Sequence, residues 1–398
     1  MAYIRAIDVA RLATRGITVR RPLNREVNVF FGANGSGKTS LLRILHSALN
    51  GRSKELRRVA FSDATIEIED AKVYLPRTEK PYRGRVIRTT RLVGVPVEQL
   101  TALEQPLSDD FGVDPAKRVG EKKKTWHTFP EELASEPLEL RHTYLPISRL
   151  YINEDRRFIR SRRDSTGDPI VSETELDEIF TDMVNFLWLR YTRNTSLEIQ
   201  RAQSMGISDI LADFLASDDD APAPFAADTA AAYKRLQAFL DRQPRRRSSV
   251  ITQEGFERRI KGDYRMQLVL KDIENIELEV ERIRRPRTEF ESVLREMISS
   301  EKTVQLGDRD IHAFAEAGEI DLGDLSSGEK QLLRICIDVL LADGEPVLID
   351  EPELSMHIDW QRRLIPALRA LAPESQLIVA THSPEIMASL KDYHIFEL

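Results

Sequence analysis

The segment GANGSGKT at Gly32–Thr39 has the residue types and spacing that hold the phosphates of a nucleotide. Its glycines let the backbone curl so that N–H groups face the phosphate oxygens at the start of a helix. Lys38 brings a positive charge to the same oxygens, and the hydroxyl of Thr39 suits Mg²⁺. The predicted nucleotide contacts are Gly32, Asn34, Gly35, Ser36, Gly37, Lys38, Thr39 and Ser40.

A second segment, VLIDEPE at Val347–Glu353, ends an apolar run with two carboxylates. The run suits a central parallel strand, and a carboxylate at the end of such a strand faces the ligand crevice. Asp350 would hold Mg²⁺ through water, and Glu351 would orient and deprotonate the attacking water. The alternative is an acidic turn after a buried strand, but the phosphate loop favours the catalytic interpretation.

His382 follows another apolar run, Leu377–Ala380, in the string IVATHSPE. At the end of a neighbouring strand it would reach the terminal phosphate and sense its presence. A single histidine usually has a structural role. The order of phosphate loop, Asp-Glu pair and histidine favours a functional one here.

The string LSSGEKQ at Leu325–Gln331 predicts a helix whose N-terminus faces an anion. Ser326 and Ser327 would donate to phosphate, and Gly328 opens the helix. The same pattern fits an ordinary helix cap with Glu329 in the first turn, and both interpretations can hold together. One chain cannot easily bring this helix to its own phosphate loop, so we predict a partner subunit and two composite sites.

The surrounding pattern predicts the elements that position these residues. Strands are expected at Tyr3–Val9, Ile17–Arg20, Val27–Phe31, Val86–Val95, Thr143–Ile147, Val304–Leu306, His312–Phe314, Pro346–Ile349 and Gln376–Thr381. A hairpin is expected at Thr65–Leu75. Helices are expected at Thr39–Leu49, Glu329–Leu341 and Asp359–Leu371, where apolar residues recur at helical spacing.

The middle of the chain has a different sequence pattern, in which helical spacing of apolar residues predominates. Separate helices are predicted at Thr174–Tyr191, Ser204–Ala216 and Ala230–Leu240, followed by a heptad seam from Met266 to Ile283 that Pro286 should kink or break. We therefore expect a compact helical arm and three domains: an N-lobe at 1–150, a helical insertion at 151–300 and a C-lobe at 301–398.

Composition excludes several classes of protein. The 398 residues include 41% hydrophobic and 31% charged residues, and the net charge is −7. This balance argues against a generally basic, DNA-coating protein. No apolar run is long enough for a membrane span, and the N-terminus has no signal core. The one cysteine, Cys336, excludes a disulfide framework. A cytoplasmic protein is expected.

These four motifs resemble those of the ATP-binding-cassette ATPases, in the branch that includes the chromosome-structure (SMC) ATPases and the overcoming-lysogenization-defect (OLD) proteins. The resemblance implies an α/β head, with a mixed sheet, flanking helices and an antiparallel β-subdomain, interrupted by a helical insertion. It makes Gly32–Thr39 the Walker A motif, Leu325–Gln331 the signature, Glu351 the catalytic glutamate and His382 the switch histidine. Asp350 closes Walker B, and Glu353–Asp359 takes the place of the D-loop.

The same resemblance implies a head-to-tail homodimer, or a higher homo-oligomer, with ATP and Mg²⁺ between signature and Walker A. A Q-loop glutamine is not assigned: Ser148 and Arg149 follow the expected strand at Thr143–Ile147, and Gln99 and Gln105 are earlier alternatives.

For biological role, the architecture resembles the stand-alone ATPases of bacterial anti-phage defence systems. We expect an ATP-hydrolysing switch that controls a separate effector, such as a nuclease. The alternative is a DNA-repair or recombination ATPase that acts on DNA, which groups of arginines at 156–163, 245–247 and 282–287 would contact. A third hypothesis is a nucleotide-gated scaffold with negligible turnover.

Overall fold

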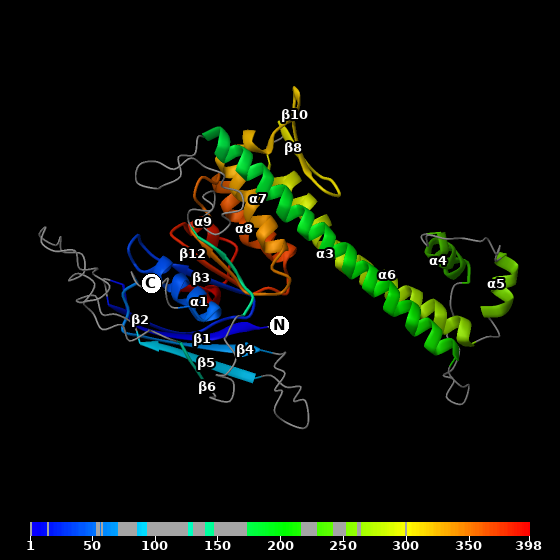
Figure 1. The fold of residues 1–398 in the computed structure, drawn as a ribbon, viewed down its shortest axis with the longest axis horizontal. Helices are drawn as coiled ribbons and strands as arrows, with labels where there is room; N and C mark the ends of the chain where they lie inside the picture. Colours follow the sequence, from blue (N-terminus) through cyan, green and yellow to red (C-terminus); the bar gives the residue numbers. More distant parts are fainter. Residues whose placement is uncertain are drawn as a thin grey trace, which may run out of the picture. The chain divides into compact units, whose positions relative to one another are not determined.

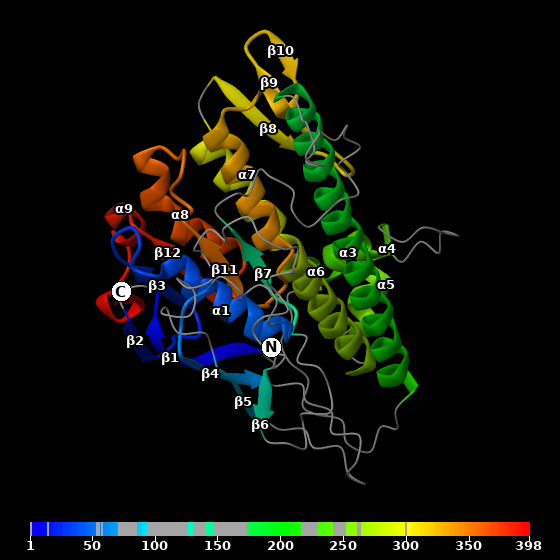
Figure 2. The same ribbon diagram turned by 60° about the vertical axis from the view of Figure 1, so that its left-hand side comes forward.

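A computed structural model gives the fold and describes residues 2–13, 16–52, 56, 59–70, 86–93, 126–129, 140–146, 173–215, 229–241, 252–260, 264–298 and 301–398. Contacts within the chain define two compact units (Figures 1 and 2). The first comprises residues 1–188 and 290–398, and the second comprises residues 189–289.

A five-stranded parallel sheet forms the centre of the first unit. Its order is β13 (Ile395–Glu397), β3 (Val27–Phe31), β12 (Leu377–Thr381), β11 (Val347–Asp350) and β7 (Thr143–Leu145). Every residue of β11 and β12 is buried, as expected for central parallel strands. Because the strands are parallel, the carboxyl ends of β3, β11 and β12 meet at one edge.

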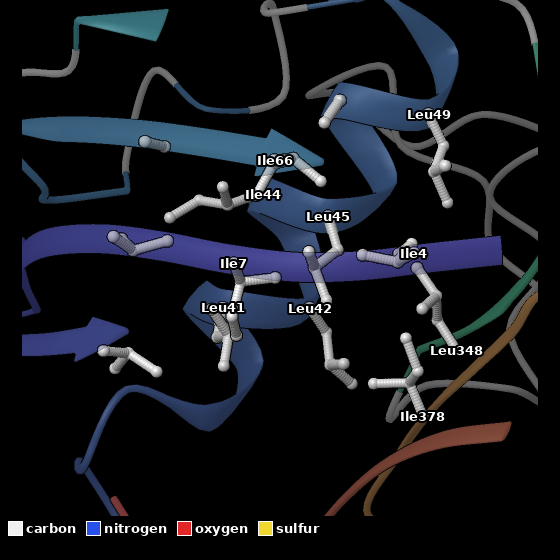
Figure 3. Packing of buried hydrophobic residues seen from close by; sticks show 14 of the residues in the cluster. Ile4, Ile7, Leu41, Leu42, Ile44, Leu45, Leu49, Ile66, Leu348 and Ile378 are labelled. Atoms are coloured by element: carbon white, nitrogen blue, oxygen red, sulfur yellow. The ribbon is translucent and has the colours of Figure 1, made fainter. Parts of the chain in front are cut away.

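An antiparallel sheet packs on the other side of helix α1 (Lys38–Asn50). Its order is β2 (Ile17–Pro22), β1 (Tyr3–Leu12), β4 (Asp63–Asp70), β5 (Val86–Val93) and β6 (His127–Phe129). Leu41, Leu42 and Leu45 of α1 are fully buried and lie in one apolar cluster with Ile4 and Ile7 of β1 (Figure 3). This packing fixes the helix that follows the phosphate loop.

The hairpin expected at Thr65–Leu75 is wrong for the residues that the structure describes there. Residues 63–70 form the single strand β4, which pairs with β1 on one side and β5 on the other. The alternation of Ile66 and Ile68 reflects one buried sheet face rather than a turn. Residues 71–75 lie outside the described part.

The C-terminal part of the first unit carries the remaining motifs. Its elements are β8 (Lys302–Leu306), β9 (Ile311–Ala315), β10 (Gly318–Ile320), η5 (Leu322–Asp324), α7 (Ser327–Leu340), α8 (Ile358–Leu371), α9 (Pro384–Met387) and η6 (Asp392–His394). The strands β8–β10 form a small antiparallel sheet. The predicted fold class, an α/β head with an antiparallel β-subdomain and a helical insertion, is confirmed.

The insertion contains α3 (Glu173–Leu215), α4 (Thr229–Asp241), α5 (Gln253–Ile260) and α6 (Tyr264–Met297). In the second unit, α3 and α6 run antiparallel, because Gly206 lies against Ile276 while Tyr191 lies near Arg287. A Cβ on residue 206 would be 2.2 Å from Ile276, so glycine permits this close approach. Leu236, Phe239 and Phe256 of α4 and α5 complete the core of this unit.

Two predictions about the insertion are wrong. The helices expected at Thr174–Tyr191 and Ser204–Ala216 are parts of the continuous 43-residue helix α3. Of the two effects expected at Pro286, a kink or a break, the break is wrong, because α6 continues through the proline to Met297. Buried residues on both sides of the proline, Val280 and Phe290, offset the lost backbone hydrogen bond.

Candidate nucleotide-binding site

The phosphate loop connects β3 to α1 and depends on glycine backbone conformations. Gly35 has φ 80° and Gly37 has φ 105°, both in the left-handed region. Gly37 directly precedes the first helical residue, Lys38, so the helix N-terminus opens into the loop. A Cβ on Gly32 would lie 2.7 Å from both Ser36 Oγ and the backbone carbonyl oxygen of Leu398, so glycine is favoured at this position. The loop therefore presents backbone N–H groups at a positive helix end.

Lys38 lies over this loop and is only 4% exposed. Its Nζ donates to the carbonyl oxygens of Gly32, at 2.8 Å, and Ala33, at 3.1 Å. Ser36 is buried inside the loop, and its Oγ has no hydrogen-bond partner. A buried hydroxyl without a partner is a favourable donor to a phosphate oxygen. Asn34 is exposed at the loop tip, and Ser40 lies half-buried in the first turn of α1.

Thr39 and Asp350 meet although 311 positions separate them in the sequence. The Thr39 hydroxyl donates to Asp350 Oδ1 at 3.2 Å. Asp350 is fully buried because it is the last residue of the central strand β11. A hydroxyl and a carboxylate beside a phosphate loop form the oxygen donor set that Mg²⁺ prefers. The residues present therefore fit the predicted metal.

Glu351 turns away from the strand with φ 45°, a conformation that costs a non-glycine residue of order 1–3 kcal/mol. Its backbone N–H donates to the carbonyl of Ala380 in β12 at 2.8 Å, which anchors the strained residue to the sheet. The carboxylate lies between the ammonium of Lys38 and the imidazole of His382. Oε1 is 3.7 Å from Lys38 Nζ, and Oε2 is 3.3 Å from His382 Nδ1. The strained backbone conformation thus directs the Glu351 side chain towards Lys38 and His382 instead of along the sheet.

His382 lies directly after β12, and its side chain is 42% exposed. Its Nδ1 is 3.3 Å from Glu351 Oε2 and 3.1 Å from Oε1 of Glu353, a residue that the sequence analysis placed only within the D-loop segment. The side chain of Glu353 is 4% exposed, and Oε1 accepts from the backbone N–H of His382 at 2.8 Å. The only sequence signal for Glu353 was a third acidic residue close to the Asp-Glu pair.

The signature segment forms a capped helix end. Ser326 Oγ accepts from the backbone N–H of Glu329, and Glu329 Oε2 accepts from the N–H of Ser326 at 2.7 Å. Lys302 Nζ is 3.0 Å from the same carboxylate, and the pKa of Glu329 is lowered although burial opposes this, because the Ser326 and Lys302 hydrogen bonds favour the charged form. Ser326 and Ser327 are exposed, so both hydroxyls are accessible from outside the chain.

The signature helix also packs against the D-loop segment of its own chain. A Cβ on Gly328 would lie 2.4 Å from the carbonyl oxygen of Ser355. Gln331 Nε2 donates to the carbonyl of Pro352 at 2.9 Å, and Gln361 Nε2 donates to that of Met356 at 3.0 Å. The signature helix is therefore in direct contact with the segment that follows Glu351.

A buried histidine pair lies behind the phosphate-loop helix. His46 Nδ1 is 2.7 Å from His142 Nε2, and His142 Nδ1 is 2.8 Å from the carbonyl of Leu140. The carbonyl fixes the proton on His142 Nδ1, so His46 donates to His142 Nε2. Burial lowers the pKa of both rings to about 4, which keeps the pair neutral. The pair connects α1 to the strand β7.

The structure thus brings together Lys38, Thr39, Asp350, Glu351 and His382 at the edge where the parallel strands end. The signature residues contact the D-loop segment and β8 instead. Gln99, Gln105, Ser148 and Arg149, the residues considered for a Q-loop, lie outside the described residues. No helix in the described part of the chain is long and apolar enough to cross a membrane.

Two family models match the chain. One is described as "AAA domain" and matches residues 17–298. The other is described as "AAA domain, putative AbiEii toxin, Type IV TA system" and matches residues 274–388.

Similar curated proteins include two that are named as retron ATPases. The Retron Ec83 probable ATPase of Escherichia coli is 34% identical over 87 residues, 19% of this chain and 16% of that protein. The Retron Vc95 probable ATPase of Vibrio cholerae is 30% identical over 99 residues, 22% of this chain and 19% of that protein. Each match therefore spans less than a fifth of the relative's length.

Solved structures similar to the chain include two Smc head domains. That of Pyrococcus furiosus, with an extended coiled coil and bound to the C-terminal domain of ScpA, has a TM-score of 0.42 and 13% identity, over 98% of this chain and 92% of the other. That of Pyrococcus yayanosii, with a coiled coil and joint, has a TM-score of 0.43 and 14% identity, over 100% and 95%.

Proposed function

The chain belongs to the AAA domain family of ATPases, and from this premise we propose that it binds ATP with Mg²⁺ and hydrolyses it. The observation that carries the proposal is the line of contacts from Lys38 to Glu351 to His382, at 3.7 Å and 3.3 Å. The three side chains come from separate segments of the chain and meet beside the phosphate loop. A structural role alone would not require a strained glutamate between a buried lysine and a half-exposed histidine.

Each residue has a distinct role in this proposal. The loop N–H groups and Lys38 bind the phosphates and offset their charge. Thr39 and Asp350 would hold Mg²⁺, which would supply positive charge next to the phosphate oxygens. Glu351, with its carboxylate 15% exposed, orients and deprotonates the attacking water. His382 contacts the terminal phosphate and reports its presence.

Two variants test the site. Lys38→Ala removes the phosphate charge contact and should abolish ATP binding or turnover, because the ammonium is the one basic side chain that contacts the loop carbonyls in the described residues. Glu351→Gln keeps the side-chain shape and should retain ATP binding while turnover falls by about 100-fold or more. Both are measured by phosphate release and by binding of a fluorescent ATP analogue.

Lys391→Ala is the matched control, since Lys391 is an exposed lysine beside Tyr393. It should leave both measurements unchanged. Phosphate release at the wild-type rate by Lys38→Ala would refute the site.

We propose further that two chains close head to tail around ATP. The exposed Ser326 and Ser327 hydroxyls, with the helix end at Gly328, form a donor surface that a partner's phosphate loop would complete. A homodimer is the simplest assembly, and a higher homo-oligomer would repeat the same contact. In this arrangement the N-lobe at 1–150 binds the nucleotide, the C-lobe at 301–398 supplies the signature, and the insertion at 151–300 carries the partner-binding surface.

For the biological role we propose a regulatory ATPase of an anti-phage defence system that controls a separate effector protein. The supporting observations are the similarity to two proteins named as retron ATPases and the short helical insertion. The test is co-purification with the product of a neighbouring gene, combined with phage challenge of cells that carry the Glu351→Gln variant. Unchanged protection by that variant would contradict an ATP-driven switch.

Two of the arginines considered for DNA contact give the alternative of direct action on DNA little support. Arg282 pairs with Glu279 at 2.7 Å, and Arg285 approaches Glu289 at 3.5 Å, so both charges are offset on the same helix. The groups at 156–163 and 245–247 lie outside the described residues. Stimulation of ATP turnover by DNA would restore this alternative.

A further inference from the structure

The carboxylate of Glu353 accepts several hydrogen bonds from the segment that carries His382. Its Oε1 accepts from the Thr381 hydroxyl at 2.5 Å, from the His382 N–H at 2.8 Å and from the Ser383 N–H at 3.1 Å. The side chain is only 4% exposed. A buried carboxylate is costly unless donors reach it; here three donors reach Oε1, whereas Oε2 is buried without a hydrogen-bond partner among the described residues. The position of Glu353 is therefore closely defined.

The same carboxylate also faces the imidazole ring. Oε1 is 3.1 Å from His382 Nδ1, and Glu351 Oε2 lies 3.3 Å from that nitrogen. Two carboxylate oxygens repel a nitrogen lone pair and attract an N–H group. The neutral ring thus carries its proton on Nδ1 and its lone pair on Nε2.

The carboxylates of Glu351 and Glu353 have different surroundings and therefore different roles. Glu351 must be available to the attacking water, and its carboxylate also lies near Lys38. Glu353 has no such task, because its oxygen is surrounded by the backbone and side chain of residues 381–383. It can hold the ring throughout a catalytic cycle.

We propose that Glu353 is the positioning residue of His382: it keeps the proton on Nδ1 and so makes Nε2 the nitrogen that meets the nucleotide. This inference rests on the proposed function for its meaning, since His382 is the residue positioned. Its physical content, the tautomer of one histidine, does not depend on turnover.

The network extends the role of Glu353 towards the signature. The Ser383 hydroxyl donates to Gln361 Oε1 at 2.6 Å, and Gln361 Nε2 donates to Met356 O at 3.0 Å. Gln331 of the signature helix holds Pro352, the residue just before Glu353. A shift of the signature on ATP binding would reach the ring of His382 through Glu353.

The first test is the tautomer itself. The full chain is labelled with ¹⁵N-histidine, the His382 signals are assigned with His382→Gln, and spectra are recorded in mildly alkaline buffer. We expect a protonated Nδ1 in the wild type and in Glu351→Gln, and a mixture of tautomers, or a protonated Nε2, in Glu353→Gln. The glutamine keeps the size of the side chain and one acceptor oxygen, but it loses the charge.

The second test separates binding from turnover. Glu353→Gln should lower kcat by about 10- to 100-fold, because a misplaced group loses its transition-state geometry, while ATP affinity stays within about 2-fold of wild type. Glu385→Gln is the control: Glu385 lies on the same segment, and its carboxylate pairs with Arg362 at 2.6 Å instead of with His382. It should match the wild type in both measurements.

Clear outcomes would overturn the inference. One is an unchanged His382 spectrum in a folded Glu353→Gln variant. Another is loss of the protonated Nδ1 in Glu351→Gln, because Glu351 and not Glu353 would then hold the proton. This measurement tests the inference even if Glu353→Gln fails to fold. A wild-type chain without ATP turnover would refute the proposed function alone, since the tautomer measurement would still stand.

Discussion

Adding one methyl group at Gly328 tests how the signature helix packs on its own chain, while the exposed serines of the signature stay unchanged. A Cβ at this position would lie 2.4 Å from the carbonyl oxygen of Ser355, 1.0 Å inside the 3.4 Å at which ordinary contact begins. The obstacle is backbone, and Ser355 already has φ 60°. The segment cannot easily move away, because Gln331 and Gln361 hold it on both sides.

The magnitude for Gly328→Ala follows from two opposing effects. Overpacking costs about 1–3 kcal/mol, and we take the upper part of this range, about 2–3 kcal/mol, because the obstacle is backbone; alanine gains about 1 kcal/mol over glycine in a helix. We expect a net loss of about 1–2 kcal/mol in the free energy of unfolding. For a chain of this size that corresponds to a decrease in Tm of roughly 1–3 °C. The assay is urea unfolding followed by circular dichroism, together with a thermal melt.

The same variant should affect function more than stability. The displaced Ser355 lies just beyond Glu353, so the signature and the His382 segment would both lose their alignment. We expect ATP-dependent dimerisation to weaken while ATP binding by the monomer stays close to wild type. Gly255→Ala in α5 is the matched control, because the nearest atom to a Cβ there is the flexible Thr252 hydroxyl at 3.0 Å. That change should be neutral or stabilising.

One result would refute this reasoning. If Gly328→Ala unfolds at the wild-type urea concentration and dimerises normally with ATP, the signature helix does not pack on Ser355 as described. A loss of stability with normal dimerisation would confirm the packing but contradict its link to the composite site.

Two further predictions concern the composite site and the histidine pair. Ser327→Arg places a long cation on an exposed position, so folding and ATP binding should persist while ATP-dependent dimerisation, measured by analytical ultracentrifugation, is lost. The pKa of His46 and of His142 is lowered from 6.5 to about 4, so the unfolded chain takes up protons first as the pH falls. Stability should be full above pH 6.5 and fall between 6.5 and 4, by about 3 kcal/mol for the first proton. Urea unfolding across this interval measures the loss. A His46→Gln variant with the same acid sensitivity would contradict this origin. His357→Gln is the control: it removes the cap that His357 Nδ1 provides to the Asp359 N–H at 3.3 Å, so stability should fall slightly while the acid sensitivity stays as in the wild type.

Much of the candidate site could be predicted from local pattern. A strand, a glycine turn and a helix start follow one another within a few residues around Lys38, and backbone geometry alone relates them. The apolar runs before Asp350 and His382 similarly predicted buried parallel strands, whose ends must share an edge. These predictions worked because each depends on neighbours in the sequence and on one topological rule.

The predictions that were wrong depended on distant contacts. We expected the helix to end after Tyr191, where the sequence becomes polar. It continues because a narrow apolar stripe, which includes Ile199 and Ile210, is enough to pack α3 in the second unit. Pro286 was expected to kink or break the helix, yet α6 continues through it because burial of the flanking residues outweighs the local cost of proline. Local propensity is a small energy, and tertiary burial can exceed it.

The amino-acid sequence by itself determined which chemistry the chain carries: a phosphate loop, a carboxylate pair and a histidine, each placed at the end of a strand by local spacing. Only the tertiary structure decided how these groups are aimed. Glu351 lies between Lys38 and His382 because strand β12 anchors its strained backbone, and Glu353 meets His382 across 29 positions of sequence. Such contacts depend on the packing of distant segments, which no local pattern encodes.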